Sequence, residues 1–199
     1  MEMTQPTTRP YQHAHIGRPC FGETVTGDGY VVIDLEDSLL IGIIDVLGHG
    51  EEAHELARFC ESWLKTHASS DILGLMHELH LQLKGSRGTA MTLAHLKPPL
   101  LRTVGIGNTI LYRMKDQPKG VAAQSGILGQ IMPTLRIVET PLIAGDLIFL
   151  VTDGISEHLD NLRLMSWFSL PLNRFCVEIL REYGKEHDDA TCLAVRYLP

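Results

Sequence analysis

The chain has 199 residues, of which 44% are hydrophobic and 21% charged, and its formal net charge at pH 7 is −7. This composition is typical of a folded globular domain and is too apolar for a disordered chain. The acidic balance argues against nucleic-acid binding, which depends on Lys and Arg to neutralise phosphates. We expect one domain over residues 1–199, with residues 1–10 as a loose tail.

The start of the chain is polar and lacks the apolar segment of a secretory signal. Its four cysteines are widely spaced and form no C-x-x-C pair, which favours reduced, mostly buried thiols. The longest apolar runs are far too short to span a bilayer. We therefore expect a cytoplasmic monomer that binds neither nucleic acid nor a membrane.

Two β-like runs come first, at residues 30–33 and 39–44, separated by an acidic turn. The second run is almost wholly apolar, which is typical of a strand buried on both faces. Apolar residues then recur at helical spacing from Ala53 to His67. Asp71 offers an N-cap for a second helix, which Gly85 is expected to end.

The second half of the chain returns mainly to strands. We expect these at residues 89–96, 100–106, 109–114, 135–139, 147–152 and 191–197. A helix over residues 173–183 precedes the last of them. Because helices and strands are segregated rather than strictly alternating, the order favours an α+β fold in which helices cover a large β-layer.

Acidic residues stand at the edges of several predicted strands. Asp45 ends the apolar run 39–44, Asp153 follows the run 147–152, and Asp188 and its neighbour Asp189 immediately precede the last strand. Asp28 stands just before the first clear strand. Each carboxylate would be held by a rigid sheet and reached from a loop.

A cation is the natural way to keep several converging carboxylates ionised, because they would otherwise repel one another. Oxygen ligands without a zinc-type Cys or His motif favour two Mg²⁺ or Mn²⁺ ions, which can hold and activate a bridging water. A single Asp-Gly at a strand end is more often a simple turn. Spacing alone leaves both interpretations open.

Six short segments, in this order, resemble the PPM-type metal-dependent Ser/Thr protein phosphatases. They are Gly27-Asp28, Asp45-Val46-Leu47-Gly48-His49-Gly50, Arg87-Gly88-Thr89-Ala90, Gly105-Ile106-Gly107-Asn108, Thr152-Asp153-Gly154 and Asp188-Asp189-Ala190-Thr191. Within that family the bare domain is similar to the RsbX-type phosphatases of the SpoIIE-like branch. The resemblance implies a four-layer α-β-β-α sandwich, two packed β-sheets flanked by helices, with the metal centre at one end.

The resemblance also implies roles for individual residues. Asp45 would bridge both ions, the backbone carbonyl of Val46 would bind the second ion, and Asp153 and Asp188 would ligate the first. Asp28 would orient metal-bound water, so that Asp28 and Asp45 are the expected catalytic residues. The metal-bridged water would attack phosphorus in line, without a covalent enzyme intermediate. The neighbouring Asp189 would not bind the metal directly but would hold the ligands in place.

The chain departs from many members of that family at two positions. Where they carry a candidate general acid this chain has Leu47, and the nearby His49 is either a proton donor or only a residue at the start of a helix. Where they carry a phosphate-gripping Arg this chain has Glu23. Arg18 and Arg87 are candidate substitutes, and each also has a surface or structural interpretation.

Some other patterns receive no functional role. The pairs His13/His15 and His77/His80 lack the further ligands of a zinc site. The run 105–108 favours a tight turn over a phosphate loop, because neither a helix pattern nor a Lys follows it.

The function that the resemblance implies is hydrolysis of phosphoserine and phosphothreonine. The expected substrates are phosphorylated STAS-domain proteins of a stressosome, and their dephosphorylation would reset a bacterial general stress response under an alternative sigma factor. The segment 162–170 is a candidate flap over the centre. Two alternatives stay open: a catalytically silent binding module of the same fold, and a hydrolase for a small phosphate ester.

Overall fold

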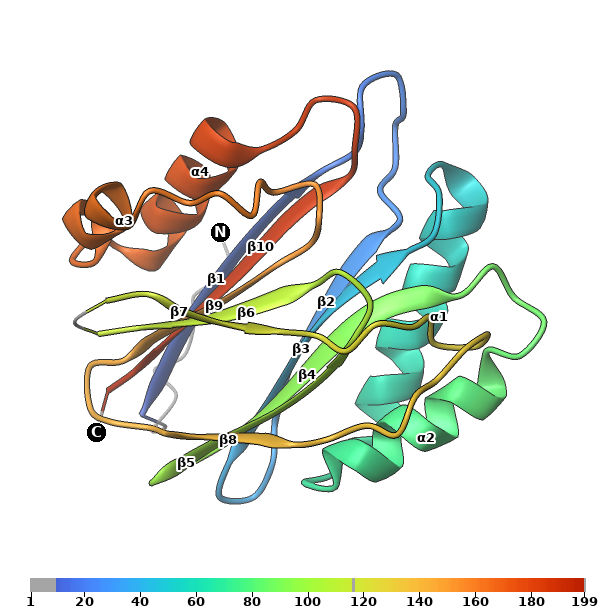
Figure 1. The fold of residues 1–199 in the computed structure, drawn as a ribbon, viewed down its shortest axis with the longest axis horizontal. Coiled ribbons are helices and arrows are strands. Elements are labelled where there is room, and N and C mark those ends of the chain that lie inside the picture. The colour runs from blue at the N-terminus through green and yellow to red at the C-terminus, as the bar shows by residue number, and fades with distance from the viewer. Residues whose placement is uncertain (1–9, 116, 199) are drawn as a thin grey trace, which may run out of the picture.

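Two antiparallel five-stranded sheets pack face to face in the computed structural model, which describes residues 10–115 and 117–198 (Figure 1). Helices α1 (Glu51–His67) and α2 (Ile72–Gln82) lie on the outside of one sheet. Helices α3 (Asn161–Trp167) and α4 (Leu172–Tyr183) lie on the outside of the other. This arrangement confirms the predicted α+β sandwich of four layers.

The strands of the first sheet lie side by side in the order in which they occur in the chain. Its order is β2 (Asp28–Asp34), β3 (Leu39–Val46), β4 (Thr89–Lys97), β5 (Leu100–Ile106) and β8 (Val138–Pro141). The interior strand β3 is the apolar run predicted to be buried on both faces, and its side chains are almost all buried. It ends two residues later than predicted, so that Asp45 belongs to the strand and is held by it.

The second sheet joins the two ends of the described chain. Its order is β1 (Tyr11–Arg18), β10 (Ala190–Tyr197), β9 (Leu147–Val151), β6 (Ile110–Met114) and β7 (Lys119–Ala122). The termini of β9 and β10 that carry the acidic residues therefore lie beside each other in one sheet.

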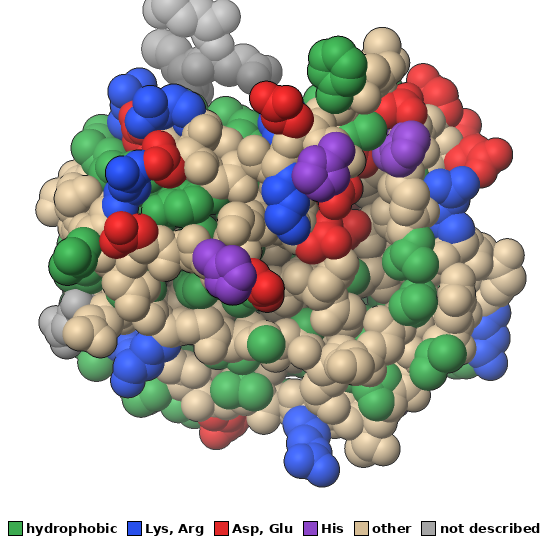
Figure 2. Space-filling model, turned by 45° about the horizontal axis from the view of Figure 1, so that its top comes forward, with side chains coloured by type: hydrophobic (Ala, Val, Ile, Leu, Met, Phe, Trp, Pro, Cys, Tyr) green, Lys and Arg blue, Asp and Glu red, His purple; other side chains and the backbone are tan. Residues whose placement is uncertain are grey.

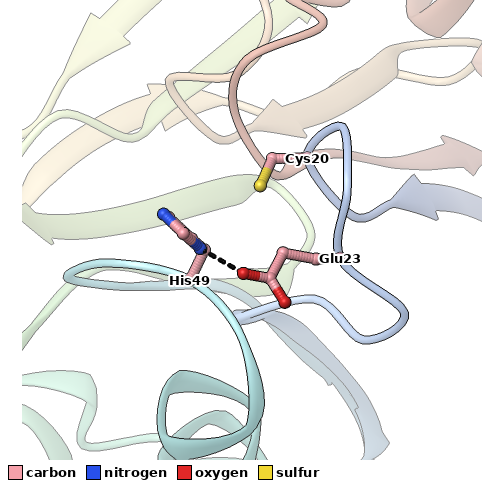
Figure 3. Close-up of side chains that lie close together, drawn as sticks. All are labelled: Cys20, Glu23 and His49. Atoms are coloured by element: carbon pink, nitrogen blue, oxygen red, sulfur yellow. Dashed lines mark hydrogen bonds and ion pairs between the residues drawn. The ribbon is translucent and has the colours of Figure 1, made fainter.

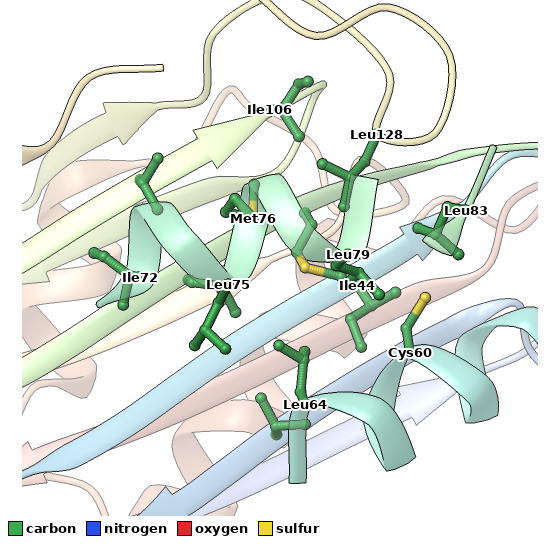
Figure 4. Close-up of a cluster of buried hydrophobic side chains, with 14 of the residues drawn as sticks. Ile44, Cys60, Leu64, Ile72, Leu75, Met76, Leu79, Leu83, Ile106 and Leu128 are labelled. Carbon is green, nitrogen blue, oxygen red and sulfur yellow. The ribbon is translucent and has the colours of Figure 1, made fainter. Parts of the chain in front are cut away.

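Apolar side chains fill the space between the layers. Ile41 and Ile43 of β3 meet Ile148 and Leu150 of β9 between the sheets. Alternate residues of β3, such as Ile44, face outward and pack under α1 and α2 (Figure 4). This alternation follows from the two-residue repeat of a strand, and it sets which way Asp45 points.

The four cysteines are free and buried, as predicted. Residues 1–9, most of the predicted tail, lie outside the described residues. Across the part of the chain that is described, no helix is long and apolar enough to cross a membrane.

Three further features differ from the sequence prediction or add to it. The strand predicted at residues 135–139 begins at Val138 instead, and Leu135 before it is buried without belonging to a strand. Strand β7 was not predicted, because its short, mostly exposed sequence lacks apolar alternation. The candidate flap contains the short helix α3, whose Leu164 is buried against the sheet side of α4.

Candidate metal centre

Asp28 and Asp45 stand directly opposite each other at one end of the first sheet, in the paired strands β2 and β3. Directly opposed side chains of an antiparallel pair lie on the same face, about 5 Å apart at Cβ. Asp45 alternates with Ile43, whose side chain lies between the two sheets. Both carboxylates are therefore held at the end of the sandwich, facing the second sheet.

Thr152 connects this pair to the second sheet. Its hydroxyl donates a hydrogen bond of 2.8 Å to Oδ2 of Asp28. The hydroxyl oxygen of Thr152 in turn accepts a hydrogen bond of 2.9 Å from the backbone N–H of Thr191 on β10. One buried hydroxyl group thus links the end of β9 to the start of β10 and to the start of β2.

Asp153 lies near Asp45 and Asp188, and burial together with the charge of Asp188 raises the pKa of its carboxyl group. Its Oδ2 also accepts a hydrogen bond of 2.5 Å from the side-chain amide of Asn108. The ammonium group of Lys185 lies 2.6 Å from the backbone carbonyl oxygen of Asp153 and donates to it. Side chains from two other loops therefore hold Asp153, one at its carboxylate and one at its backbone carbonyl.

Asp189 is buried and accepts two backbone hydrogen bonds, from Cys20 at 2.8 Å and from Gly27 at 2.7 Å. Both of its oxygens are thereby engaged with the loop that leads into β2. Asp188, by contrast, is only half-buried. This arrangement favours the predicted roles, in which Asp188 is the metal ligand and Asp189 holds the neighbouring backbone in place.

The site is unfavourable for negative charge without a counterion. Burial, reinforced by the charges of Asp28, Asp153 and Asp188, raises the pKa of Asp45 to about 9. Burial likewise raises the pKa of Asp28 to about 7, although the hydroxyl of Thr152 opposes the shift. Oδ2 of Asp45 is buried and has no hydrogen-bond partner among the described residues. An all-oxygen site of this kind fits hard divalent cations.

A polar cavity of about 220 Å³ opens at this end of the sandwich. It is lined by Asp45, Val46, Leu47, Gly48, Asn108, Asp153, Asp188 and Asp189. The surface seen in Figure 2 carries a group of acidic side chains with histidine and basic side chains at its edge. All the residues that the sequence proposed as metal ligands, including Val46, therefore border one cavity, and Asp28 lies directly behind it.

The residues proposed for proton donation and phosphate binding are placed differently. His49 does not line the cavity, and its Nδ1 lies 2.6 Å from Oε1 of Glu23. The guanidinium of Arg18 donates to backbone carbonyls, among them that of Asp188, which favours its structural interpretation. Arg87 donates to the carbonyl of Leu47 and pairs with a glutamate of α1, so it lies beside the turn after Asp45.

Three contributors to the site were not singled out as site residues from the sequence. Thr152 and Asn108 stand inside two of the segments that resemble the phosphatase family, Thr152-Asp153-Gly154 and Gly105-Ile106-Gly107-Asn108, which was the available signal. Lys185 had none, because its contact with Asp153 depends on the fold of the loop before β10.

Replacing Thr152 by valine keeps the shape of the side chain and removes its hydroxyl group. We expect the variant to lose about 1–3 kcal/mol of stability, because the Asp28 carboxylate and the Thr191 N–H each lose a buried hydrogen-bond partner. We also expect activity to fall about tenfold, which corresponds to about 1.4 kcal/mol, because Asp28 is no longer held in place. Urea unfolding and phosphate release measure the two effects.

The matched control is Thr103→Val. The Thr103 hydroxyl is buried and has no hydrogen-bond partner within the described residues, so its removal is expected to be neutral or stabilising. Equal losses in both variants would contradict a bridging role for Thr152.

With the geometry established, the chain can be compared with known proteins. The family model of stage II sporulation protein E (SpoIIE) matches residues 36–198. The chain belongs to the SpoIIE family. It is a PPM-type, PP2C-like Ser/Thr protein phosphatase by family and fold, as the sequence resemblance implied. Curated protein sequences give no significant match.

Several solved structures have a similar fold and align with almost the whole of this chain. One, from work on the bacterial stressosome as a modular system adapted to control secondary messenger signaling, is 25% identical, with a TM-score of 0.86. The match covers 94% of this chain and 99% of that one. RsbX in complex with magnesium is 16% identical, with a TM-score of 0.80 and coverage of 94% and 95%.

The PP2C phosphatase domain of SpoIIE from Bacillus subtilis is 22% identical, with a TM-score of 0.72. The match covers 94% of this chain and 63% of that longer one. At these identities RsbX and the SpoIIE domain show the shared fold.

Proposed function

We propose that this SpoIIE-family phosphatase is metal-dependent and removes phosphate from phosphoserine or phosphothreonine on STAS-domain stressosome proteins. The observation that carries the proposal is the convergence of Asp28, Asp45, Asp153 and Asp188 from both sheets on one end of the sandwich. Similarity to a solved structure from the bacterial stressosome supports the substrate class. Dephosphorylation would reset a general stress response.

In this proposal the carboxylates hold two Mn²⁺ or Mg²⁺ ions. Without the ions, burial and mutual repulsion would prevent these carboxyl groups from all being ionised at once. Asp45 would serve both ions, Asp153 and Asp188 would hold the first, and the backbone carbonyl of Val46 would bind the second. When bound, such ions supply an activated water as nucleophile and offset negative charge on the phosphoryl group.

The remaining residues of the site act by positioning. Thr152 fixes the carboxylate of Asp28, which orients water at the inner side of the cavity. Asn108 and Lys185 fix the carboxylate and the backbone of Asp153. Rigid placement matters because catalytic groups act efficiently only when held in the reactive geometry.

The substrate class is tested with a phosphorylated STAS-domain scaffold protein, incubated with the enzyme and Mn²⁺ while released phosphate is measured. We expect release that stops on chelation of the metal and resumes when Mn²⁺ is restored. Free phosphoserine, run in parallel at the same concentration, is expected to turn over at least tenfold more slowly, because it lacks the protein surface that supplies binding energy.

Each outcome of this experiment has a distinct meaning. Intact phosphoprotein after prolonged incubation would contradict the proposed substrate. Equal turnover of phosphoprotein and free phosphoserine would favour a hydrolase of small phosphate esters instead.

A further inference from the structure

A tight turn from Cys20 to Glu23 stands beside the carboxylate cavity. The backbone N–H of Glu23 donates to the carbonyl of Cys20 at 3.1 Å, and Gly22 has a φ of +94°. A positive φ at the third position is the feature of a type II turn, which favours glycine there. The turn brings the first and last of its four residues close together, and Cys20 is buried.

His49 reaches this turn from the segment that follows β3. It stands between Gly48 and Gly50, with φ values of +83° and +79°. A Cβ on Gly50 would lie 3.3 Å from the carboxylate of Glu23, so this glycine leaves the carboxylate its space. Figure 3 shows the Cys20 thiol, the Glu23 carboxylate and the His49 ring pointing toward one another. One potential ligand atom from each of these residues lies within 4.8 Å of the other two.

We propose that Cys20, Glu23 and His49 form a zinc site, separate from the all-oxygen centre at Asp45. A thiolate sulfur, an imidazole nitrogen and a carboxylate oxygen are the ligand types that Zn²⁺ takes in tetrahedral sites. Three protein ligands leave the fourth position to water. The oxygen-lined cavity suits Mg²⁺ or Mn²⁺, so the two sites select different metals.

The geometry is close to what zinc requires. Bonds of about 2.0–2.3 Å around a tetrahedral ion put the ligand atoms roughly 3.5 Å apart. Closing from 4.8 Å takes about 1 Å of movement. His49 can supply this movement because its side chain is 60% exposed, whereas Cys20 is fixed by the hydrogen bond from its own N–H to Asp189. The ion would replace the direct contact between His49 and Glu23.

An ion here would join the two segments that carry Asp28 and Asp45. The Cys20–Glu23 turn leads into β2, and Asp189 holds both the Cys20 and the Gly27 backbone N–H groups. His49 lies four residues after Asp45. Zinc binding would therefore fix the rim of the phosphatase site without supplying a ligand to it.

The test uses Co²⁺ as a spectroscopic substitute for zinc, added to the full chain with Mg²⁺ in excess. We expect one equivalent to give a thiolate-to-metal charge-transfer band that Zn²⁺ abolishes by competition. Cys20→Ser is expected to remove the band, and His49→Ala to weaken Zn²⁺ binding at least tenfold. His67→Ala, an exposed histidine on α1, is the matched control and should bind as the wild type does.

Asp45→Asn separates this inference from the proposed function. The zinc site predicts that this variant keeps the Co²⁺ band even though its phosphatase activity is lost. The proposal is overturned if the wild-type protein gives no thiolate band, or if Cys20→Ser and His49→Ala both bind Zn²⁺ as the wild type does. The three residues would then be an ordinary His–Glu hydrogen bond beside a buried thiol.

Discussion

Asp45→Asn is expected to lower Mn²⁺-dependent phosphate release at least about 1000-fold, a loss of about 4 kcal/mol of transition-state stabilisation. Asparagine keeps the size of the side chain and removes its negative charge. In the proposed centre Asp45 would serve both ions, so its loss would disturb both at once. Initial rates at saturating Mn²⁺ measure the effect.

The folded state is expected to tolerate this change. In the metal-free protein the carboxyl group of Asp45 is buried near Asp28 and Asp153 and its pKa is raised to about 9, so this side chain must take up a proton on folding at neutral pH, which lowers stability. Urea unfolding of the metal-free variant should therefore show stability at least equal to that of the wild type.

The matched control for this variant is Asp71→Asn. Asp71 is exposed and caps α2 by accepting from the N–H of Gly74, and asparagine is an equally good N-cap. Activity within twofold of the wild type is expected there. If Asp45→Asn also retained such activity, the proposed role of Asp45 would be wrong.

Gly154→Ala is expected to cost about 3 kcal/mol of stability and to abolish activity. A Cβ at this position would lie only 1.8 Å from the backbone carbonyl oxygen of Asp189 and 2.9 Å from Cα of Ala190. Because the obstacle is backbone, relief requires the loop after β9 to separate from the start of β10. That separation moves Asp153 away from Asp188. The urea midpoint and the phosphatase rate measure the two losses.

Gly85→Ala provides the comparison for this second variant. Gly85 is exposed, has a φ of +85° and has no atom within 4 Å of an added Cβ, so alanine there introduces only backbone strain of about 1–2 kcal/mol. It should leave the phosphatase rate unchanged. A Gly154→Ala protein with wild-type midpoint and rate would contradict the close approach of these two loops.

The acidic residues could be located from the sequence because each follows or precedes a strong apolar run. The run that ends at Asp45 and the run that ends before Asp153 are buried strands, and strands hold the residue at their end in a definite direction. Their convergence could not be derived from spacing. It depends on the pairing of Asp28 with Asp45 and on the packing of one sheet on the other.

Other features lacked a local signal altogether. Thr152 and Asp28 are 124 positions apart, so their hydrogen bond has no trace in local pattern. Strand β7 is an exposed edge that needs no apolar face. The group of Cys20, Glu23 and His49 arises only when the Cys20–Glu23 turn folds against the segment after β3, and no zinc-type spacing marks it in the sequence.

Calorimetric titration of Mn²⁺ into the metal-free protein, wild type beside Asp45→Asn, tests the proposed metal centre most directly. The wild type is expected to bind two ions per chain, and Asp45→Asn to lose at least one of them and to weaken the other more than tenfold. Identical binding curves for the two proteins, or no Mn²⁺ binding to the wild type, would contradict a centre bridged by Asp45.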